Sequence, residues 1–134
     1  MEAQMRLEFH HLGVACNSIQ SGLKHYKSLG YEVESELYND PVLGINCLFI
    51  SMDDSPRLEL CEALPGVNVL SPWLSSGSPI YHLAYKVDVR WEEFQKSVNE
   101  KIVLPPTPAV AFQGKNIWFT IRGNRQLVEY IENA

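Results

Sequence analysis

The sequence has few cysteines, no excess of basic residues and no long apolar run, and each absence excludes a class of protein. Its three cysteines form no CxxC motif and cannot all pair within one chain, which favours reduced thiols and a cytoplasmic protein over a disulfide scaffold. A net charge of −5 argues against a nucleic-acid partner. No apolar run approaches the roughly 20 residues of a membrane span, and the first residues lack the apolar core of a signal peptide. We therefore expect neither a nucleic-acid partner nor a membrane.

A repeat of about 70 residues is the most informative pattern that the sequence does contain. Residues 9–15 read FHHLGVA and residues 80–87 read IYHLAYKV, and each run precedes a helix-like stretch. Residues 57–62 (RLELCE) and 126–132 (QLVEYIE) repeat in the same way. With 46% hydrophobic residues in 134 positions, the chain is about one domain long. The repeat therefore predicts two similar modules within one domain.

Hydrophobic periodicity predicts the same order of elements, β-α-β-β-β, in both halves. We expect a single domain over residues 1–134, with a first module at about 7–63, a linker rich in Pro, Gly and Ser at about 64–79, and a second module at about 80–134. Short consecutive strands joined by tight turns favour an α+β class with mostly antiparallel pairing over a doubly wound sheet. The expected strands are 9–15, 31–38, 45–52, 57–62, 80–87, 102–104, 116–122 and 126–132, with a Pro-rich loop at 105–108. The expected helices are capped at Asn17-Ser18 and at Asp88, with Leu29 and Gln95 on their buried faces.

Four residues of metal-ligand type occupy equivalent positions in the repeat: His82 follows His11 by 71 positions, and Glu129 follows Glu59 by 70. A lone Glu in an apolar strand usually faces water, because burying an unpaired carboxylate costs several kcal/mol. A lone His is more often structural than a ligand. The matched spacing on the first and last strands of both modules instead favours a joint site. Two imidazoles and two carboxylates suit one divalent ion of Zn, Ni, Co, Mn or Fe.

Five further residues are candidates for a substrate cavity, and each has a simpler interpretation. Core packing is the default for the aromatic residues, and a small buried hydrophobe is the default for the cysteine. The arginine could bind an anionic substrate or be a solvated turn residue. The candidates are Tyr38, Cys61, Phe112, Trp118 and Arg122.

Several segments, in this order and spacing, resemble the vicinal oxygen chelate superfamily, which includes glyoxalase I, methylmalonyl-CoA epimerase, ring-cleaving dioxygenases and bleomycin-resistance proteins. The likeness covers nearly the whole chain and is closest to the epimerase-like and glyoxalase I-like members. The segments that carry it are HLGVA at 11–15, HYKSLGY at 25–31, GINCLFI at 44–50, RLEL at 57–60, NIWF at 116–119 and QLVEY at 126–130.

The resemblance implies two βαβββ modules that form a cupped, mostly antiparallel mixed sheet, and a possible homodimer. It implies one divalent metal ion bound by His11, Glu59, His82 and Glu129, with Glu129 also the catalytic base. The implied function is a metal-dependent isomerase, epimerase or glyoxalase-type lyase that abstracts a proton next to a carbonyl of a small substrate. An Fe-dependent dioxygenase is disfavoured, because such enzymes use two His and one Glu and Glu59 fills the remaining position.

One position departs from the epimerase pattern. Epimerases of this family carry an acid, the second catalytic base, two residues before the glycine that corresponds to Gly44. This sequence has Val42 there, and the nearest acid is Asp40. The alternative function is therefore a protein of the bleomycin-resistance type, which binds and sequesters a small molecule.

Overall fold

The computed structural model describes residues 5–133, so the expected domain limits at 1 and 134 lie outside the described residues. The chain divides into two compact units. The N-terminal unit comprises residues 11–81, and the C-terminal unit comprises the residues up to 10 together with those from 82 onward. Among the described residues, no helix is both long enough and apolar enough to span a membrane.

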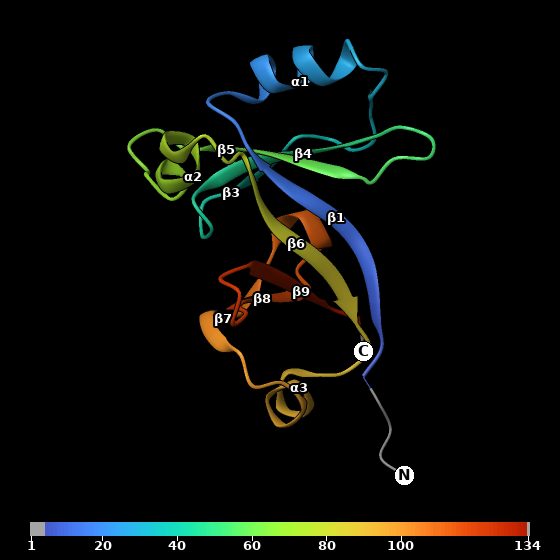
Figure 1. Cartoon of the computed structure of the whole chain (residues 1–134), viewed down its shortest axis with the longest axis vertical. Coiled ribbons are helices and arrows are strands. Elements are labelled where there is room, and N and C mark those ends of the chain that lie inside the picture. The colour runs from blue at the N-terminus through green and yellow to red at the C-terminus, as the bar shows by residue number, and fades with distance from the viewer. Residues whose placement is uncertain (1–4, 134) are drawn as a thin grey trace. The chain divides into compact units, whose positions relative to one another are not determined.

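The N-terminal unit is built on strands in the order β2-β4-β5-β1, with β3 also paired to β4. Strand β1 runs parallel to β5, whereas the other pairs in this unit are antiparallel. The elements are β1 (Leu7–Ala15, of which the first four residues belong to the other unit), α1 (Ile19–Lys27), β2 (Glu32–Val33), β3 (Tyr38–Asp40), β4 (Ile45–Ser51), β5 (Leu58–Ala63) and α2 (Ser71–Ser76) (Figure 1).

The C-terminal unit repeats this arrangement, with strands in the order β6-β9-β8-β7. Strand β6 is parallel to β9, and the remaining pairs are antiparallel. The fold is therefore mixed α+β, mostly strands. The order β-α-β-β-β expected from the sequence is confirmed in this unit, whereas the N-terminal unit has one more strand after its first helix. The elements are β6 (Ile80–Val87), α3 (Trp91–Ser97), β7 (Lys101–Pro108), the 3₁₀ turn η1 (Val110–Phe112), β8 (Asn116–Ile121) and β9 (Leu127–Glu132).

Helix α1 covers one face of the N-terminal strands (Figure 1). Its start is defined by Ser18, whose hydroxyl accepts a hydrogen bond from the backbone N–H of Ser21 at 3.1 Å, as the sequence predicted. The carboxylate of Glu62 on β5 accepts a second bond, from Ile19 N–H at 2.6 Å. The apolar side of the helix packs on β1, β4 and β5, so α1 does not cover the opposite face of these strands. The core on this side is Val14, Cys16, Ile19, Tyr31, Leu48, Ile50, Leu58 and Leu60.

Helix α3 covers the corresponding face of the C-terminal unit. Phe94 is 1% exposed, and its ring lies 4.6 Å from that of Tyr130 and 5.2 Å from that of Trp118. Trp91 completes this aromatic packing from the first turn of α3. The side chains of β8 and β9 that alternate with these core residues consequently face the other way, as strand pleating requires.

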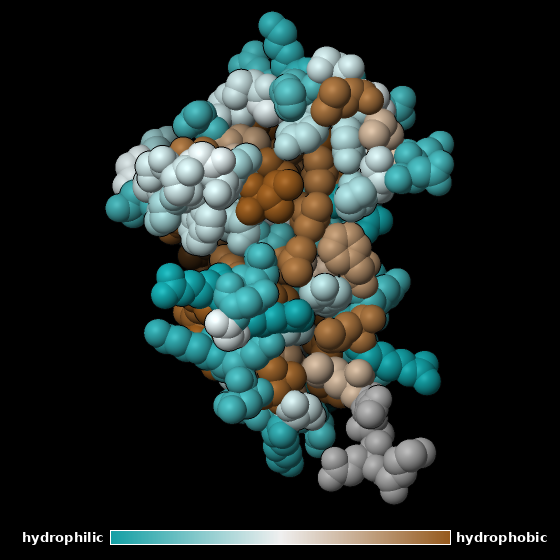
Figure 2. Space-filling view, viewed as in Figure 1, coloured by the Kyte–Doolittle hydropathy of each residue, from teal (hydrophilic) through white to brown (hydrophobic). Residues whose placement is uncertain are grey.

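Two expectations for the N-terminal half are corrected. The single strand expected at 31–38 is two short strands, β2 and β3, separated by a loop. Helix α1 ends at Lys27, so Leu29 lies beyond it in the turn and is 58% exposed. The expected linker contains α2, which is capped by Gly77 with a left-handed φ of +75°. Figure 2 shows side chains of intermediate hydropathy over this segment.

Two expectations for the C-terminal half are corrected as well. Asp88 does not cap α3: the helix follows Arg90, and the Asp88 carboxylate accepts a bond from the backbone N–H of Arg6 at 2.8 Å. Gln95 lies within α3 but is exposed, whereas the sequence predicted it on the buried face. The Pro-rich stretch expected to be a loop instead continues β7 to Pro108, and a register shift between Leu104 and Thr107 spans Pro105 and Pro106, which lack an N–H group.

Candidate metal centre

His11 and Glu59 form a buried pair in the N-terminal unit. Gly13 lies beside Glu59 in the parallel β1–β5 register, so His11, two residues earlier on β1, shares the face of Glu59. The Nε2 atom of His11 lies 3.3 Å from Oε1 of Glu59, and their side chains are 0% and 6% exposed. This face is the one that α1 leaves uncovered. His11 and Glu59 therefore lie together on this face.

His82 and Glu129 form the matching pair in the C-terminal unit. Ala84 lies beside Glu129 in the parallel β6–β9 register, which places His82 on the face of Glu129. The Nδ1 atom of His82 lies 3.9 Å from Oε1 of Glu129, and these side chains are 1% and 5% exposed. Each of the four residues can offer one ligand atom, an imidazole nitrogen or a carboxylate oxygen. Their metal role stays a prediction.

A phenylalanine accompanies each pair, and sequence reasoning missed both. Phe49 is paired with Glu59 across β4 and β5, and its ring contacts the His11 imidazole edge-on at 5.2 Å. Phe119 is paired with Glu129 across β8 and β9, and its ring contacts the His82 imidazole at 5.3 Å. The two phenylalanines are 70 positions apart, the offset of the glutamates. The same repeat could therefore have identified both phenylalanines from the sequence.

Two of the predicted substrate residues lie on the same face as Glu59. Tyr38 on β3 places its ring 6.4 Å from that of Phe49. Cys61 is fully buried, and its thiol donates to Oε1 of Glu59 at 3.4 Å. Burial raises the pKa of the Cys61 thiol well above its ordinary value, and the nearby Glu59 and Cys47 raise it further. This thiol is therefore held in its protonated, hydrogen-bond-donating form.

The other three predicted substrate residues lie in the C-terminal unit. Trp118 is fully buried on the α3 side of β8 and belongs to the aromatic core. Phe112 lies in η1, where its ring contacts that of His10 at 5.4 Å. Arg122 follows β8, as expected for a turn residue.

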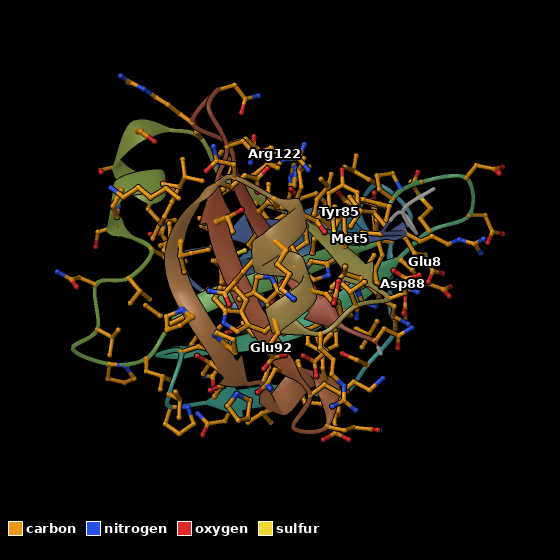
Figure 3. All side chains as sticks on the ribbon, turned by 90° about the horizontal axis from the view of Figure 1, so that it is seen from below. Met5, Glu8, Tyr85, Asp88, Glu92 and Arg122 are labelled. Atoms are coloured by element: carbon orange, nitrogen blue, oxygen red, sulfur yellow. The ribbon has the colours of Figure 1, made fainter. Side chains whose placement is uncertain are left out.

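Arg122 lies among protein groups of its own unit. Its Nε lies 3.4 Å from Oε2 of Glu100, and its guanidinium lies 5.8 Å from the centre of the Tyr85 ring (Figure 3). A hydrogen bond to the Tyr130 hydroxyl raises the pKa of Arg122, and Glu100 raises it further. The Glu100 carboxylate also accepts bonds from Thr120 and Tyr130, at 2.5 and 3.0 Å. This network gives Arg122 a structural role in addition to any contact with a substrate.

Comparison with known proteins identifies the family. Residues 10–119 match the Glyoxalase/Bleomycin resistance protein/Dioxygenase superfamily, and the chain belongs to it. The matched range contains His11, Glu59 and His82 and ends before Glu129. A search of curated protein sequences finds no match.

Solved structures show the same fold. A hypothetical protein from Bacillus halodurans C-125 is 23% identical with a TM-score of 0.77, over 96% of this chain and 95% of that one. Methylmalonyl-CoA epimerase from Mycobacterium tuberculosis is 18% identical with a TM-score of 0.69, over 94% and 87% of the two chains. The Streptomyces coelicolor epimerase in complex with 2-nitronate-propionyl-CoA is 16% identical with a TM-score of 0.70, over 94% and 96%. The predicted glyoxalase-like fold is thus confirmed.

Proposed function

We propose that the protein is a divalent-metal-dependent enzyme that removes a proton next to a carbonyl group of a small substrate, as an isomerase, an epimerase or a glyoxalase-type lyase. The observation that carries the proposal is the duplicated, buried His–Glu pair, His11 with Glu59 and His82 with Glu129. Membership of the superfamily and the likeness to epimerase structures support a metal-dependent, epimerase-like activity at the level of the family.

The donor set fits one divalent cation held by all four residues. Two ionised carboxylates bring two negative charges, whereas two neutral imidazoles bring none, so a divalent ion would balance the charge. Burying two carboxylates costs several kcal/mol each unless the charge is compensated, and both glutamates are buried. Two nitrogen and two oxygen donors are suited to Zn²⁺, Ni²⁺, Co²⁺, Mn²⁺ or Fe²⁺. A bound ion of this kind would supply Lewis-acid stabilisation of negative charge on a substrate oxygen.

Within this proposal the protein's own residues position the substrate and move one proton. Glu129 is the base that takes the proton from the carbon next to the carbonyl and returns it, to the same or to a neighbouring carbon. A base so positioned contributes about 10²–10⁴-fold to the rate. Phe49 and Phe119 shield the imidazoles edge-on. Their apolar rings lower the local polarity, which strengthens electrostatic interactions within the site.

The residues near Gly44 favour a reaction with one base over a two-base epimerisation. Val42, which replaces the second base of the epimerases, is 74% exposed. The nearest acid, Asp40, is 2% exposed, and its Oδ1 accepts a hydrogen bond from the backbone N–H of Leu43 at 3.1 Å. Asp40 is therefore engaged in the turn. This arrangement supports a glyoxalase-type or isomerase reaction, in which one carboxylate both removes and returns the proton.

Metal analysis and deuterium exchange test this function together. Purified protein is assayed for bound metal by mass spectrometry, before and after incubation with each candidate ion. Metal-loaded protein is then incubated in D₂O with a panel of α-hydroxy-carbonyl compounds and with methylmalonyl-CoA. We expect one ion per chain and incorporation of deuterium next to the carbonyl of at least one compound. Glu129→Gln should retain metal but lose at least about 100-fold of the exchange rate.

The same experiment has two outcomes that count against the proposal. If the protein binds none of the ions, the proposal of a metal-dependent enzyme is wrong. If the Glu129→Gln variant still catalyses deuterium exchange at the wild-type rate, Glu129 is not the base.

A binding protein without catalytic activity is the second candidate, and the exposed, apolar Val42 in place of an acid favours it. This candidate predicts that a small molecule protects the protein against thermal unfolding, whereas no compound of the panel exchanges its protons. Val42→Glu distinguishes the two candidates further. If the metal and Glu129 are already catalytically active, a second acid at this position should raise the rate of methylmalonyl-CoA epimerisation. In a binding protein without catalytic activity, the same substitution should leave that rate unchanged.

A further inference from the structure

The two halves of the proposed metal site are not equivalent, because only one of the two glutamates has a thiol beside it. Cys61 follows Glu59 by two residues on β5 and therefore shares its face. The corresponding residue of the second module is Ile131, two residues after Glu129 on β9, and it is 1% exposed. One carboxylate thus has a hydrogen-bond donor beside it, and the other has an apolar side chain.

The thiol of Cys61 is itself held by a neighbour. Cys61 is 0% exposed, and it is hydrogen-bonded to the side chain of Tyr81, at the start of β6. Tyr81 is 8% exposed, and its ring lies 5.0 Å from that of Trp73 on α2. The tyrosine hydroxyl donates to the sulfur, and the thiol donates to Oε1 of Glu59 at 3.4 Å. All of these residues belong to the N-terminal unit.

The oxygen that accepts from Cys61 is also the one that approaches His11. Oε1 of Glu59 lies 3.3 Å from His11 Nε2. A carboxylate has about four acceptor positions, so a bond from the thiol leaves positions on Glu59 for a metal ion. The thiol bond fixes the rotation of the carboxylate plane and selects which positions remain. Groups that orient a ligand in this way are worth about 10–100-fold in metal affinity.

We propose that Cys61, held by Tyr81, is a positioning residue that fixes the orientation of Glu59 as a metal ligand. The proposal rests on the proposed function. Duplication alone would make the two glutamates equivalent, whereas Cys61 stands two residues after Glu59 and Ile131 stands at the corresponding position after Glu129.

Cobalt binding tests the proposal, because the visible bands of Co²⁺ report its coordination geometry and its affinity at once. Wild-type protein, Cys61→Ala, Cys61→Ser and Tyr81→Phe are titrated with Co²⁺ against a competing chelator. Since a thiol is a weak donor, we expect Cys61→Ala to bind about tenfold more weakly with shifted bands. Tyr81→Phe should lose less, and Cys61→Ser, which keeps a donor, should recover most of the affinity.

Cys16→Ala is the matched control, because Cys16 is another buried cysteine and contacts the carbonyl of Val14 rather than Glu59. It should bind Co²⁺ as the wild type does. Thermal unfolding of each metal-free variant identifies any that fails to fold, and Tyr81→Phe, which deletes one oxygen, keeps the test available if Cys61→Ala does not fold.

Two results would overturn the positioning role of Cys61, and a third would contradict the proposed function. Wild-type affinity and bands in both Cys61→Ala and Tyr81→Phe would overturn the positioning role. A near-ultraviolet thiolate-to-cobalt band that disappears in Cys61→Ala would also overturn it, by making Cys61 a ligand. A wild-type protein that binds no Co²⁺ or other divalent ion would instead be a failure of the proposed function.

Discussion

Phe119 lies directly opposite Glu129 in the β8–β9 pair, and its ring meets the imidazole of His82 edge-on at 5.3 Å. Phe49 has the same relation to Glu59 and His11 in the N-terminal unit. The two rings differ in burial, since Phe49 is 5% exposed and Phe119 is half-buried. Each unit therefore repeats a His, a Glu and a Phe on one face, with unequal contributions to the core.

This difference in burial predicts unequal stability losses. Phe49→Ala should lower the free energy of unfolding by about 3–5 kcal/mol, the usual cost of deleting a buried aromatic ring. Phe119→Ala should cost less, because part of its ring is already in water. Chemical denaturation of the two metal-free variants measures both values. Equal losses would contradict the burial difference.

Glu62 predicts a stability effect at the start of α1. Its carboxylate accepts from Ile19 N–H at 2.6 Å and from Asn46 Nδ2 at 3.0 Å. Glu62→Ala should lower the free energy of unfolding by about 1.5–3 kcal/mol, because hydrogen bonds to a charged group are lost near a helix N-terminus. Glu62→Gln should lose less. The exposed Glu36→Ala is the control and should change stability by no more than about 0.5 kcal/mol. A Glu62→Ala loss no larger than that of this control would refute the capping role.

Cys16 predicts a loss of stability at alkaline pH. Burial raises the pKa of its thiol from 9.0 to about 11. The folded state therefore holds this proton more tightly than the unfolded state, so its contribution is fully present below pH 9 and is lost as the pH rises through about 11. Urea unfolding at about pH 8, 9, 10 and 11 measures how the free energy of unfolding changes with pH. Cys16→Ala should unfold with a shallower decline, and an unchanged slope would contradict the assignment.

Trp118 predicts a separation between stability and metal binding. The side chain is fully buried among Phe94 and Trp91, at ring distances of 5.2 and 5.3 Å. Trp118→Ala should cost about 3–5 kcal/mol and Trp118→Phe less, since the phenyl ring fills part of the space. Bound metal per chain should be unchanged in Trp118→Phe. A variant that keeps its stability and loses its metal would place Trp118 at the site instead.

Metal addition predicts a reversible gain in stability. A divalent ion at about 100 times its dissociation constant should raise the free energy of unfolding by about 2.7 kcal/mol, if it binds the folded state alone. A chelator should reverse the gain. Thermal unfolding with and without metal measures it, and His82→Ala should remove most of it. Glu36→Ala, which changes an exposed acid, should keep the full gain.

Much of the fold could be predicted because the strands are strongly patterned and repeated. The strand at 80–87 agrees with the structure residue for residue, and the helix cap expected at Asn17-Ser18 is formed by Ser18. The less regular parts could not be predicted. A Pro-rich stretch lacks backbone donors and is typical of a loop, yet β7 continues through it because the pairing with β8 shifts its register between Leu104 and Thr107.

The sequence by itself determined where the His–Glu pairs lie in the repeat and which face each residue takes, because strand pleating is local and the offsets of 71 and 70 can be counted. Only the tertiary structure decided which residues are their neighbours. Phe49, Phe119 and the Tyr81–Cys61 contact depend on the register between strands and on side chains far apart in the chain. A shift of one residue in that register would turn each of them to the other face, and no local pattern specifies it.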